Sequence, residues 1–442
     1  MSKGISELWK EEDWWAVWIG FIIIGFTLLN IVPKIPKVGK WTDNPLAAFQ
    51  IIKDGQVIGG NLLPLLGLLA GLLILTAIGI AAMKTVKISH YIPGFIVIFI
   101  LACVAYWFAN QVNVKYWGLS YAMWALLLGL LISNTVGSPK WLLAGARTEY
   151  FIKTGLVLLG CEILFKKILS LGVPGLMVAW IVTPTVVIFM YRYGTKFIKM
   201  KNKELAIIIA AATSVCGVSA AIATAAACRA KKEDLTLAVG MTLIFTVLMM
   251  IFMPIGIKMI GMNHILGGAW MGGTIDSTGA VVAAGSMLGA DAEQVAAVVK
   301  MIQNVLIGLL AFVVAIYWVC FVESKPDAPR PNAMEIWYRF PKFVIGFVAA
   351  SLIFSFAVVP AMHGDFNLVE ANYINPVTKT LRGWFFCLAF IAIGLESNFK
   401  DLASRMEGGK PMNLYVVGQS FNLILTLLMA WIAFMLLFPN SI

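Results

Sequence analysis

The sequence predicts an all-α polytopic membrane protein, because apolar residues dominate its composition and recur in long runs. The chain of 442 residues is 60% hydrophobic and 12% charged, whereas a soluble protein carries roughly 25% charged residues. Apolar runs of about 18 residues or more, the length that crosses a ~30 Å hydrocarbon core, recur along the chain. No stretch is polar enough for a separate soluble domain, so we expect one transmembrane domain over residues 1–442.

The apolar segments predict about 11 to 13 transmembrane helices. Residues 1–115 hold N-terminal helices, and residues 116–442 hold the core of the domain. The acidic residues before the first segment are not typical of a cleavable signal peptide, so that segment is expected to be retained. The segments lie near residues 14–33, 63–83, 92–109, 116–134, 150–166, 172–191, 204–228, 234–257, 264–287, 293–322, 343–361, 383–399 and 411–438.

The charged residues between the segments predict the orientation of the chain. The net charge is +11, and the basic residues stand mostly in short loops, as in membrane proteins whose cytoplasmic loops are rich in Lys and Arg. We interpret this pattern as a topology signal rather than a nucleic-acid-binding surface. If every segment spans, the loops on the side of the N-terminus hold more Lys and Arg, and residues 192–203 are the densest. This favours a cytoplasmic N-terminus.

The side chains that build metal sites and catalytic centres are sparse or badly positioned. Six cysteines stand in apolar segments without a C-x-x-C pair, so neither a disulfide framework nor a zinc site is expected. His90, His264 and His363 fall at segment ends or in loops, which excludes a buried histidine relay. The sequence contains no phosphate-binding loop and no nucleophile motif, so we expect neither an enzyme nor a cofactor.

A short internal repeat indicates that the fold contains two related halves. Residues 158–166 and 392–400 share the pattern G-x-E-x-x-F-K at the end of an apolar segment. The copies fall in the fifth and twelfth segments, and this odd separation predicts opposite orientations in the membrane. Inverted repeats are a recurring build of secondary transporters.

Two segments, 204–228 and 264–287, are rich in Gly, Ala, Ser and Thr and are predicted to contain discontinuous helices. Broken backbone at membrane depth is tolerated only where it lines a cavity or is buried in protein. The free N–H groups that open the second half-helix then attract an anion. The alternative is close helix packing through small side chains. The candidate substrate-binding residues in these segments are Thr213, Ser214, Cys216, Gly217, Ser219, Gly272, Gly273, Thr274, Ser277 and Thr278.

Two ionisable residues lie inside apolar segments, Asp276 well within its segment and Lys300 one turn or more from the start of its own. Asp276 is a candidate ligand for Na⁺, a proton carrier or the partner of a lysine, because a charge at that depth costs roughly 2.5–3.5 kcal/mol on insertion scales. A compatible alternative is that Asp276 or Ser277 caps the half-helix that follows. Lys300, with Asn304 at i+4 on the same helix face, could bind an anionic substrate or pair with Asp276. The alternative for Lys300 is snorkelling to the membrane interface.

Glu162 and Glu396, the carboxylates of the repeat, lie about one turn from the ends of their helices. The simplest interpretation is an ion pair with Lys166 or Lys400 at i+4. The sharper hypothesis is that these two carboxylates couple transport to a cation. Lys153 opens its helix and is expected to snorkel.

These motifs resemble those of the putative sulfate exporter family of bacterial membrane proteins. Residues 213–220, Thr-Ser-Val-Cys-Gly-Val-Ser-Ala, resemble one family signature, residues 272–285 resemble a second, and Val299-Lys300 with the following helix resemble a third. Residues 127–134 and 153–160 are similar to the family's earlier helices. The resemblance covers roughly residues 116 to 440. It implies an inner-membrane carrier, similar in fold to the bile-acid/sodium symporters, with inverted repeats and two discontinuous helices that cross at the midplane.

The sequence departs from the family's pattern at the candidate site. Asp276-Ser277 stand where many members have a His-Glu pair, and Gln303 or Asn304 stands in place of an Arg. The loss of a cationic group weakens the case for a divalent oxyanion such as sulfate. It favours an anion that is balanced by a co-transported cation at Asp276.

The sequence therefore predicts a secondary active transporter of a small anion, such as sulfate, sulfite, a sulfonate or a carboxylate, coupled to Na⁺ or H⁺. The two broken segments, Lys300 and Asn304 would bind the substrate, and Asp276, Glu162 and Glu396 are the candidate ion-coupling residues. The alternatives are a channel-like anion pore and a sodium-coupled organic-anion symporter. The expected partners are the anion and the lipid bilayer, with no nucleic acid, and a homodimer is left open.

Overall fold

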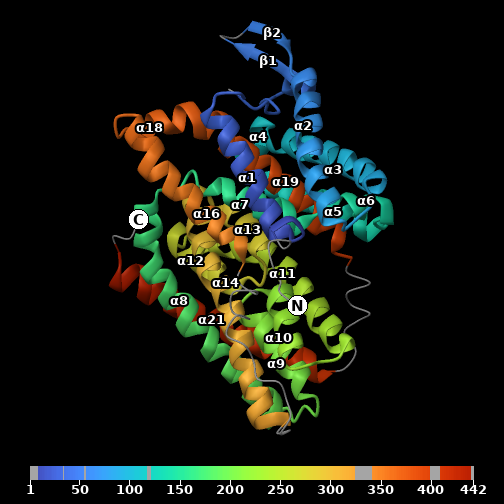
Figure 1. Ribbon diagram of the computed structural model, residues 1–442, viewed down its shortest axis with the longest axis vertical. Coiled ribbons are helices and arrows are strands. Elements are labelled where there is room, and N and C mark those ends of the chain that lie inside the picture. Colours follow the sequence, from blue (N-terminus) through green and yellow to red (C-terminus); the bar gives the residue numbers. More distant parts are fainter. Residues whose placement is uncertain are drawn as a thin grey trace. The chain divides into compact units, whose positions relative to one another are not determined.

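The computed structural model describes residues 8–32, 34–53, 56–116, 121–323, 341–398 and 409–439, and these residues are almost entirely helical (Figure 1). Eight helices in the described ranges are long and apolar enough to cross a membrane. The prediction of an all-α polytopic membrane protein is therefore confirmed. One feature outside the prediction is a small antiparallel hairpin formed by β1 (Gln50–Lys53) and β2 (Gln56–Gly60).

The chain folds into two compact units, each built from two separate stretches of sequence. Unit 1 comprises Met1–Lys166 and Lys342–Asn398, and unit 2 comprises Lys167–Pro341 and Phe399–Ile442. The chain leaves unit 1 for unit 2 twice, and each crossing falls within or at the end of one copy of the G-x-E-x-x-F-K repeat. The repeat therefore marks the two places where the chain passes from unit 1 into unit 2.

Unit 1 is formed by helices from its two stretches of sequence. They are α1 (Glu12–Leu28), η2 (Pro45–Phe49), α2 (Leu62–Met83), α3 (Ile88–Ala109), α4 (Val112–Tyr116), α5 (Tyr121–Thr135), α6 (Lys140–Gly145), α7 (Thr148–Leu159), α16 (Lys342–Ile353), η5 (Phe354–Val358), α17 (Val359–Ala361), α18 (Phe366–Val369), η6 (Glu370–Thr378) and α19 (Lys379–Glu396).

The segment expected near 383–399 begins much earlier in the structure, since an uninterrupted helical stretch runs from Phe366 to Glu396. Its first turns carry Asn367, Glu370 and Asn375, which lower the hydropathy that marks a span in the sequence. The stretch includes the π-helical η6 around Pro376.

The glycines of the two repeat copies allow similar close helix contacts in unit 1. A Cβ at Gly160, just after α7, would lie 2.3 Å from the Phe347 carbonyl oxygen of α16. A Cβ at Gly394, near the end of α19, would lie 2.6 Å from the Leu126 carbonyl oxygen of α5. Both sites therefore require glycine for the approach of two backbones.

A serine from the neighbouring helix completes each of these contacts. The Ser351 hydroxyl donates to the Ile163 carbonyl at 2.5 Å, and the Ser133 hydroxyl donates to the Ser397 carbonyl at 3.1 Å. Each acceptor lies three residues after the glycine of its repeat copy. This shared packing supports a structural repeat, and the opposite orientation of its copies stays a prediction.

Unit 2 contains both segments that were predicted to be discontinuous, and both are broken. Residues 204–228 form α9 and α10, and residues 264–287 form α12 and α13. The helices of this unit are α8 (Phe165–Arg192, which begins in unit 1), η3 (Tyr193–Phe197), α9 (Lys203–Ser214), α10 (Gly217–Ala227), α11 (Lys232–Met259), α12 (His264–Thr274), α13 (Thr278–Leu288), α14 (Ala290–Tyr317), η4 (Trp318–Glu323), α21 (Gly409–Trp431) and η7 (Ile432–Leu437).

Candidate functional site

The two broken segments of unit 2 touch each other at their breaks. Cys216, before α10, is extended with φ −149° and ψ 98°, and Ser277, before α13, is extended with φ −138° and ψ 135°. The Gly217 N–H donates to the Asp276 carbonyl at 2.5 Å. The two discontinuous helices therefore cross where each one is interrupted.

Gly217 is required for this crossing. A Cβ at this position would lie 2.8 Å from Thr242 Cγ2 and 3.0 Å from the Asp276 carbonyl oxygen. Any side chain at this position would push α11 or the second break away. The close contact therefore explains why a glycine stands at the break of the first segment.

A glutamine of α14 joins the two breaks. The Gln303 amide nitrogen Nε2 donates to the Ser214 carbonyl at 2.9 Å and to the Gly273 carbonyl at 3.0 Å. The Thr183 hydroxyl of α8 also donates to the Ser214 carbonyl, at 3.0 Å. One buried amide thus bonds the C-terminal ends of both first half-helices, α9 and α12.

Two amides of α21 bond the carbonyls next to these. Asn422 Nδ2 donates to the Thr213 carbonyl at 3.0 Å, and Gln419 Nε2 donates to the Thr274 carbonyl at 3.2 Å. Unpaired carbonyls are costly at membrane depth. The amides of α14 and α21 therefore explain how both breaks persist inside an apolar unit.

Asp276 is buried beside the crossing, with 1% of its surface exposed. Its Oδ2 accepts hydrogen bonds from the Tyr415 hydroxyl and, at 3.0 Å, from the Thr242 hydroxyl. The N-cap residue of α13 is Ser277, which makes no side-chain cap hydrogen bond. The carboxylate therefore bonds to α11 and α21 instead of capping α13.

Lys300 is buried in the same place, and its exposed fraction is also 1%. Its ammonium donates to the Val215 carbonyl and, at 2.7 Å, to Gln303 Oε1. The snorkelling alternative is therefore wrong, and the hydrogen bonds of Lys300 go to neutral oxygens rather than to Asp276. A cation at the C-terminal end of α9 faces the negative end of that helix dipole.

Several buried oxygens near the second break have no hydrogen-bond donor among the described residues. Four oxygen atoms in the described part of unit 2 share this property: Asp276 Oδ1, Thr274 Oγ1, Asn304 Oδ1 and Gln419 Oε1. Hard cations prefer oxygen ligands of these kinds. No cluster of three or more His, Cys, Asp and Glu side chains occurs in the described ranges.

The N-terminal ends of α10 and α13 lie at the crossing and are only partly buried. Neither Cys216 nor Ser277 caps the helix that it precedes, and both are half-buried. Ser219, in the first turn of α10, is exposed. The uncapped amides of a helix N-terminus together with its dipole favour an anion.

The other predicted substrate-binding residues divide into two groups. Thr278 lies at the crossing, where its hydroxyl accepts from Asn304 Nδ2 at 2.9 Å. The Thr213 and Ser214 hydroxyls donate back to carbonyls of their own helix. Gly272 and Gly273 serve packing, since a Cβ at either site would lie 2.7 Å from an atom of α14 or α21.

The two repeat carboxylates lie in unit 1 and not at this crossing. Glu162 forms a buried ion pair with Arg382 of α19, with Oε1 2.6 Å from Nε. Glu396 accepts a hydrogen bond from the Thr148 hydroxyl at 3.0 Å. Lys400, the expected partner of Glu396, lies outside the described residues.

Lys153 is held by acidic side chains of α1 and of its own helix. Its ammonium lies 3.1 Å from Glu12, 2.9 Å from Asp13 and 3.6 Å from Glu149. This residue therefore links α7 to α1 in an ion-pair network and does not extend alone to the interface.

Sequence reasoning missed Tyr415, Gln419 and Asn422, although α21 carries a signal for them. Their spacings of four and three residues put all three on one face of α21. A row of polar side chains on one face of an otherwise apolar span indicates a buried partner.

Comparison with known proteins identifies the family. The family model described as Conserved hypothetical protein 698 matches residues 93–414. This chain belongs to that family. Its members correspond to the putative sulfate exporter family that the motifs of the broken segments resemble, and the match begins upstream of the expected core.

Relatives from three bacteria carry membrane-protein names. The chain is 53% identical over 412 residues to a UPF0324 membrane protein of Rhodopirellula baltica, covering 93% of this chain and 73% of the relative. It is 53% identical over 380 residues to a UPF0324 membrane protein of Nitratidesulfovibrio vulgaris, covering 86% and 65%. It is 24% identical over 334 residues to the UPF0324 inner membrane protein YeiH of Escherichia coli, covering 74% and 90%. No solved structure matches the chain.

Proposed function

We propose that this protein is a secondary active transporter of a small anion, coupled to Na⁺ or H⁺, in the bacterial inner membrane with its N-terminus in the cytoplasm. The observation that carries the proposal is the crossing of two discontinuous helices beside a buried ammonium and a buried carboxylate in unit 2. Broken helices whose half-helix ends surround substrate and coupling ion are a recurring build of secondary transporters.

The positive ends of two helices support an anionic substrate. The N-termini of α10 and α13 each contribute about half a positive charge, and the Lys300 ammonium adds a full charge whose hydrogen bonds go to neutral oxygens. The exposed Ser219 hydroxyl offers a further donor at the accessible end of α10. This set fits a small oxyanion, a sulfonate or a carboxylate.

The environment of Asp276 supports a coupled cation. One carboxylate oxygen takes both hydroxyl donors, from Tyr415 and Thr242, while the other has no donor in the part of the chain that the structure describes. A proton or Na⁺ at this second oxygen would satisfy it and would neutralise the carboxylate that otherwise repels the anion. Binding of cation and anion would therefore favour each other, which is the requirement for coupled transport.

The carbonyls at the breaks argue against the channel alternative. Pores that use broken helices present free backbone carbonyls to the ions that pass. Here the carbonyls of residues 213–215, 273 and 274 accept hydrogen bonds from buried side chains. The proposal includes no enzymatic activity.

The purified protein in liposomes tests the proposal. Uptake of labelled sulfate, sulfite, a sulfonate and a carboxylate is measured with an imposed Na⁺ gradient, with a pH gradient and with neither. We expect saturable accumulation of one anion class under one of the two gradients. Absence of accumulation of every anion under both gradients contradicts the proposal, and single-channel currents favour the pore.

A further inference from the structure

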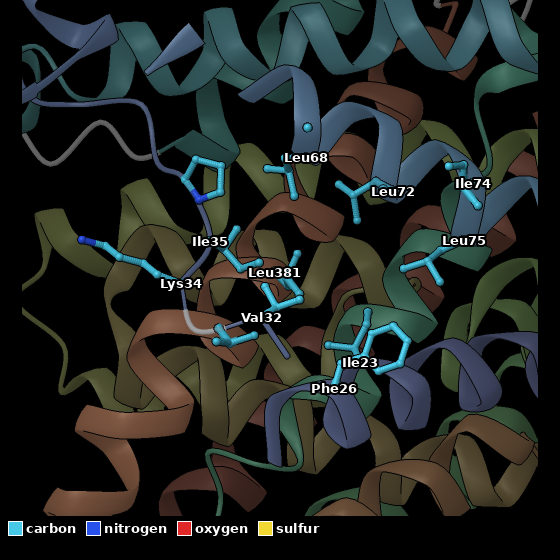
Figure 2. Close-up of a pocket in the computed structure, with 14 residues that line it drawn as sticks. Ile23, Phe26, Val32, Lys34, Ile35, Leu68, Leu72, Ile74, Leu75 and Leu381 are labelled. Atoms are coloured by element: carbon cyan, nitrogen blue, oxygen red, sulfur yellow. The ribbon is translucent and has the colours of Figure 1, made fainter. Parts of the chain in front are cut away.

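Unit 1 holds an apolar cavity of 370 Å³ that has no part in the transport site. This volume lies in the range of small-molecule pockets. Lys34 is the single charged residue among the 14 that line the cavity. Figure 2 shows side chains of α1, α2 and Leu381 of α19 around a common space, with the ammonium of Lys34 pointing away from them.

Two glycines hollow the face of α2 that lines this cavity. A Cβ at Gly67 or at Gly71 would meet no atom within 4 Å, so neither glycine is needed for close backbone packing. Phe26 and Ile74, which also line the cavity, are 42% and 60% exposed. The cavity is therefore continuous with the exposed apolar surface of α1 and α2.

Positive charge gathers at one end of the cavity. Lys34 lines the cavity, and Lys37 stands three residues further along the same connecting segment. Burial, together with the positive charges of Lys34 and Lys379, lowers the pKa of Lys37. Lys379 has Glu370 as an ion-pair partner at 3.9 Å. Lys37 donates to the Asn375 carbonyl at 3.4 Å, and neither Lys34 nor Lys37 has a carboxylate partner among the described residues.

We propose that this cavity binds an anionic phospholipid, with one acyl chain against α1 and α2 and the headgroup phosphate between Lys34 and Lys37. The apolar lining matches a hydrocarbon chain, and the bilayer supplies that chain directly to an opening on the apolar surface. A neutral lipid would leave the two lysines without a counter-charge, and a free anion would leave the apolar lining uncovered. Basic residues next to membrane-embedded helices bind anionic headgroups in this way.

Lipid retention by the full-length protein tests the proposal. The protein is reconstituted in vesicles of phosphatidylglycerol mixed equally with phosphatidylcholine and is then extracted with mild detergent. Native mass spectrometry measures the ratio of the two lipids that stay bound. Wild-type protein should retain phosphatidylglycerol in preference to phosphatidylcholine.

Two double variants distinguish binding of the lipid headgroup from binding of the acyl chain, and each variant has a matched control. In K34Q/K37Q the preference for phosphatidylglycerol should fall roughly fivefold for each lysine, while K84Q/K87Q, which neutralises two exposed lysines beyond the other end of α2, should keep it. In G67L/G71L the leucines fill the cavity, and retention of both lipids should fall. G25L should not change it, because a Cβ at Gly25 meets no atom within 4 Å and Gly25 does not line the cavity.

Three results would overturn the proposal: equal retention of the two lipids by wild-type protein, an unchanged preference in K34Q/K37Q, or unchanged retention in G67L/G71L. The thermal unfolding midpoint of each variant is measured alongside its lipid retention. The two lysines of K34Q/K37Q stand in a connecting segment and have no carboxylate partner among the described residues, so the folding of this variant is expected to match that of wild type.

Discussion

Gln303→Leu should loosen both breaks at once, because a single amide bonds to both. Gln303 Nε2 donates to the Ser214 and Gly273 carbonyls, and its Oε1 accepts from the Lys300 ammonium. Leucine has a similar volume but no polar atoms. The substitution therefore removes these three hydrogen bonds and a fourth, from Nε2 to the Thr183 hydroxyl at 3.3 Å, while it changes the packing little.

The size of the destabilisation depends on which hydrogen bonds each partner of Gln303 retains after the substitution. The Ser214 carbonyl retains the Thr183 hydroxyl, and Lys300 retains the Val215 carbonyl, whereas the Gly273 carbonyl loses the donor that the structure gives it. A buried polar group left unsatisfied costs about 1–3 kcal/mol. The Gly273 carbonyl is left without its donor and the ammonium loses one of its acceptors, so we expect a loss of about 3 kcal/mol, or a fall in Tm of roughly 3 °C.

Thermal unfolding in detergent, followed by the fluorescence of the 15 tryptophans, measures this fall. Gln419→Leu is the matched control, because Gln419 donates to a carbonyl of only one break. Its Tm should fall by about half as much. If Gln303→Leu unfolds within about a degree of wild type, or falls less than Gln419→Leu, the amide does not hold the crossing together.

Three further predictions concern single side chains. Gly217→Ala should lower stability by about 1–3 kcal/mol through overpacking against α11, whereas Gly256→Ala, with open space at its Cβ, should be neutral or stabilising in the same unfolding assay. Arg382→Met should lower the free energy of unfolding by about 3–5 kcal/mol, because it leaves the buried Glu162 without its cation. The double variant E162Q/R382M should recover part of this loss, and a failure to recover it would refute the ion-pair explanation. Lys300→Met should reduce anion uptake at least tenfold in liposomes. Uptake at the wild-type level by this variant would show that Lys300 does not contribute to anion binding.

The broken helices could be predicted from sequence because their cause is local. Gly217 and the Gly-rich run around Asp276 stand in the middle of apolar segments, where small and polar residues weaken a continuous helix. Both breaks lie where the sequence predicts them. The depth of Asp276 in the second segment likewise predicted its burial, and its exposed fraction is 1%. For Lys300 the sequence left snorkelling open, and an exposed fraction of 1% contradicts that alternative.

The partners of these residues could not be predicted, because they come from distant parts of the chain. Tyr415 bonds to Asp276 across 139 positions, and Arg382 bonds to Glu162 across 220. The i+4 rule considers only neighbours on the same helix, so it assigned Glu162 to Lys166. Only the fold determines that α19 lies against α7 and that α21 lies against both breaks.

The cavity of unit 1 could not be predicted from sequence, because it depends on the absence of side chains at two glycines of α2. Gly67 and Gly71 look like ordinary small residues of an apolar span. Whether they face a neighbouring backbone or open space depends on the packing of α1 and α19 around them. Hydropathy alone does not distinguish these two cases.

The central claim is that the carboxylate at the crossing couples a cation to anion transport, and Asp276→Asn in liposomes tests it most directly. The measurement is gradient-driven accumulation of the anion that the wild-type protein transports, with Asp291→Asn as the control, because Asp291 is an exposed carboxylate at the start of α14. We predict that Asp276→Asn loses at least nine-tenths of the accumulation while Asp291→Asn keeps it, since the amide can neither release a proton nor balance Na⁺. Accumulation at the wild-type level by Asp276→Asn would contradict the claim.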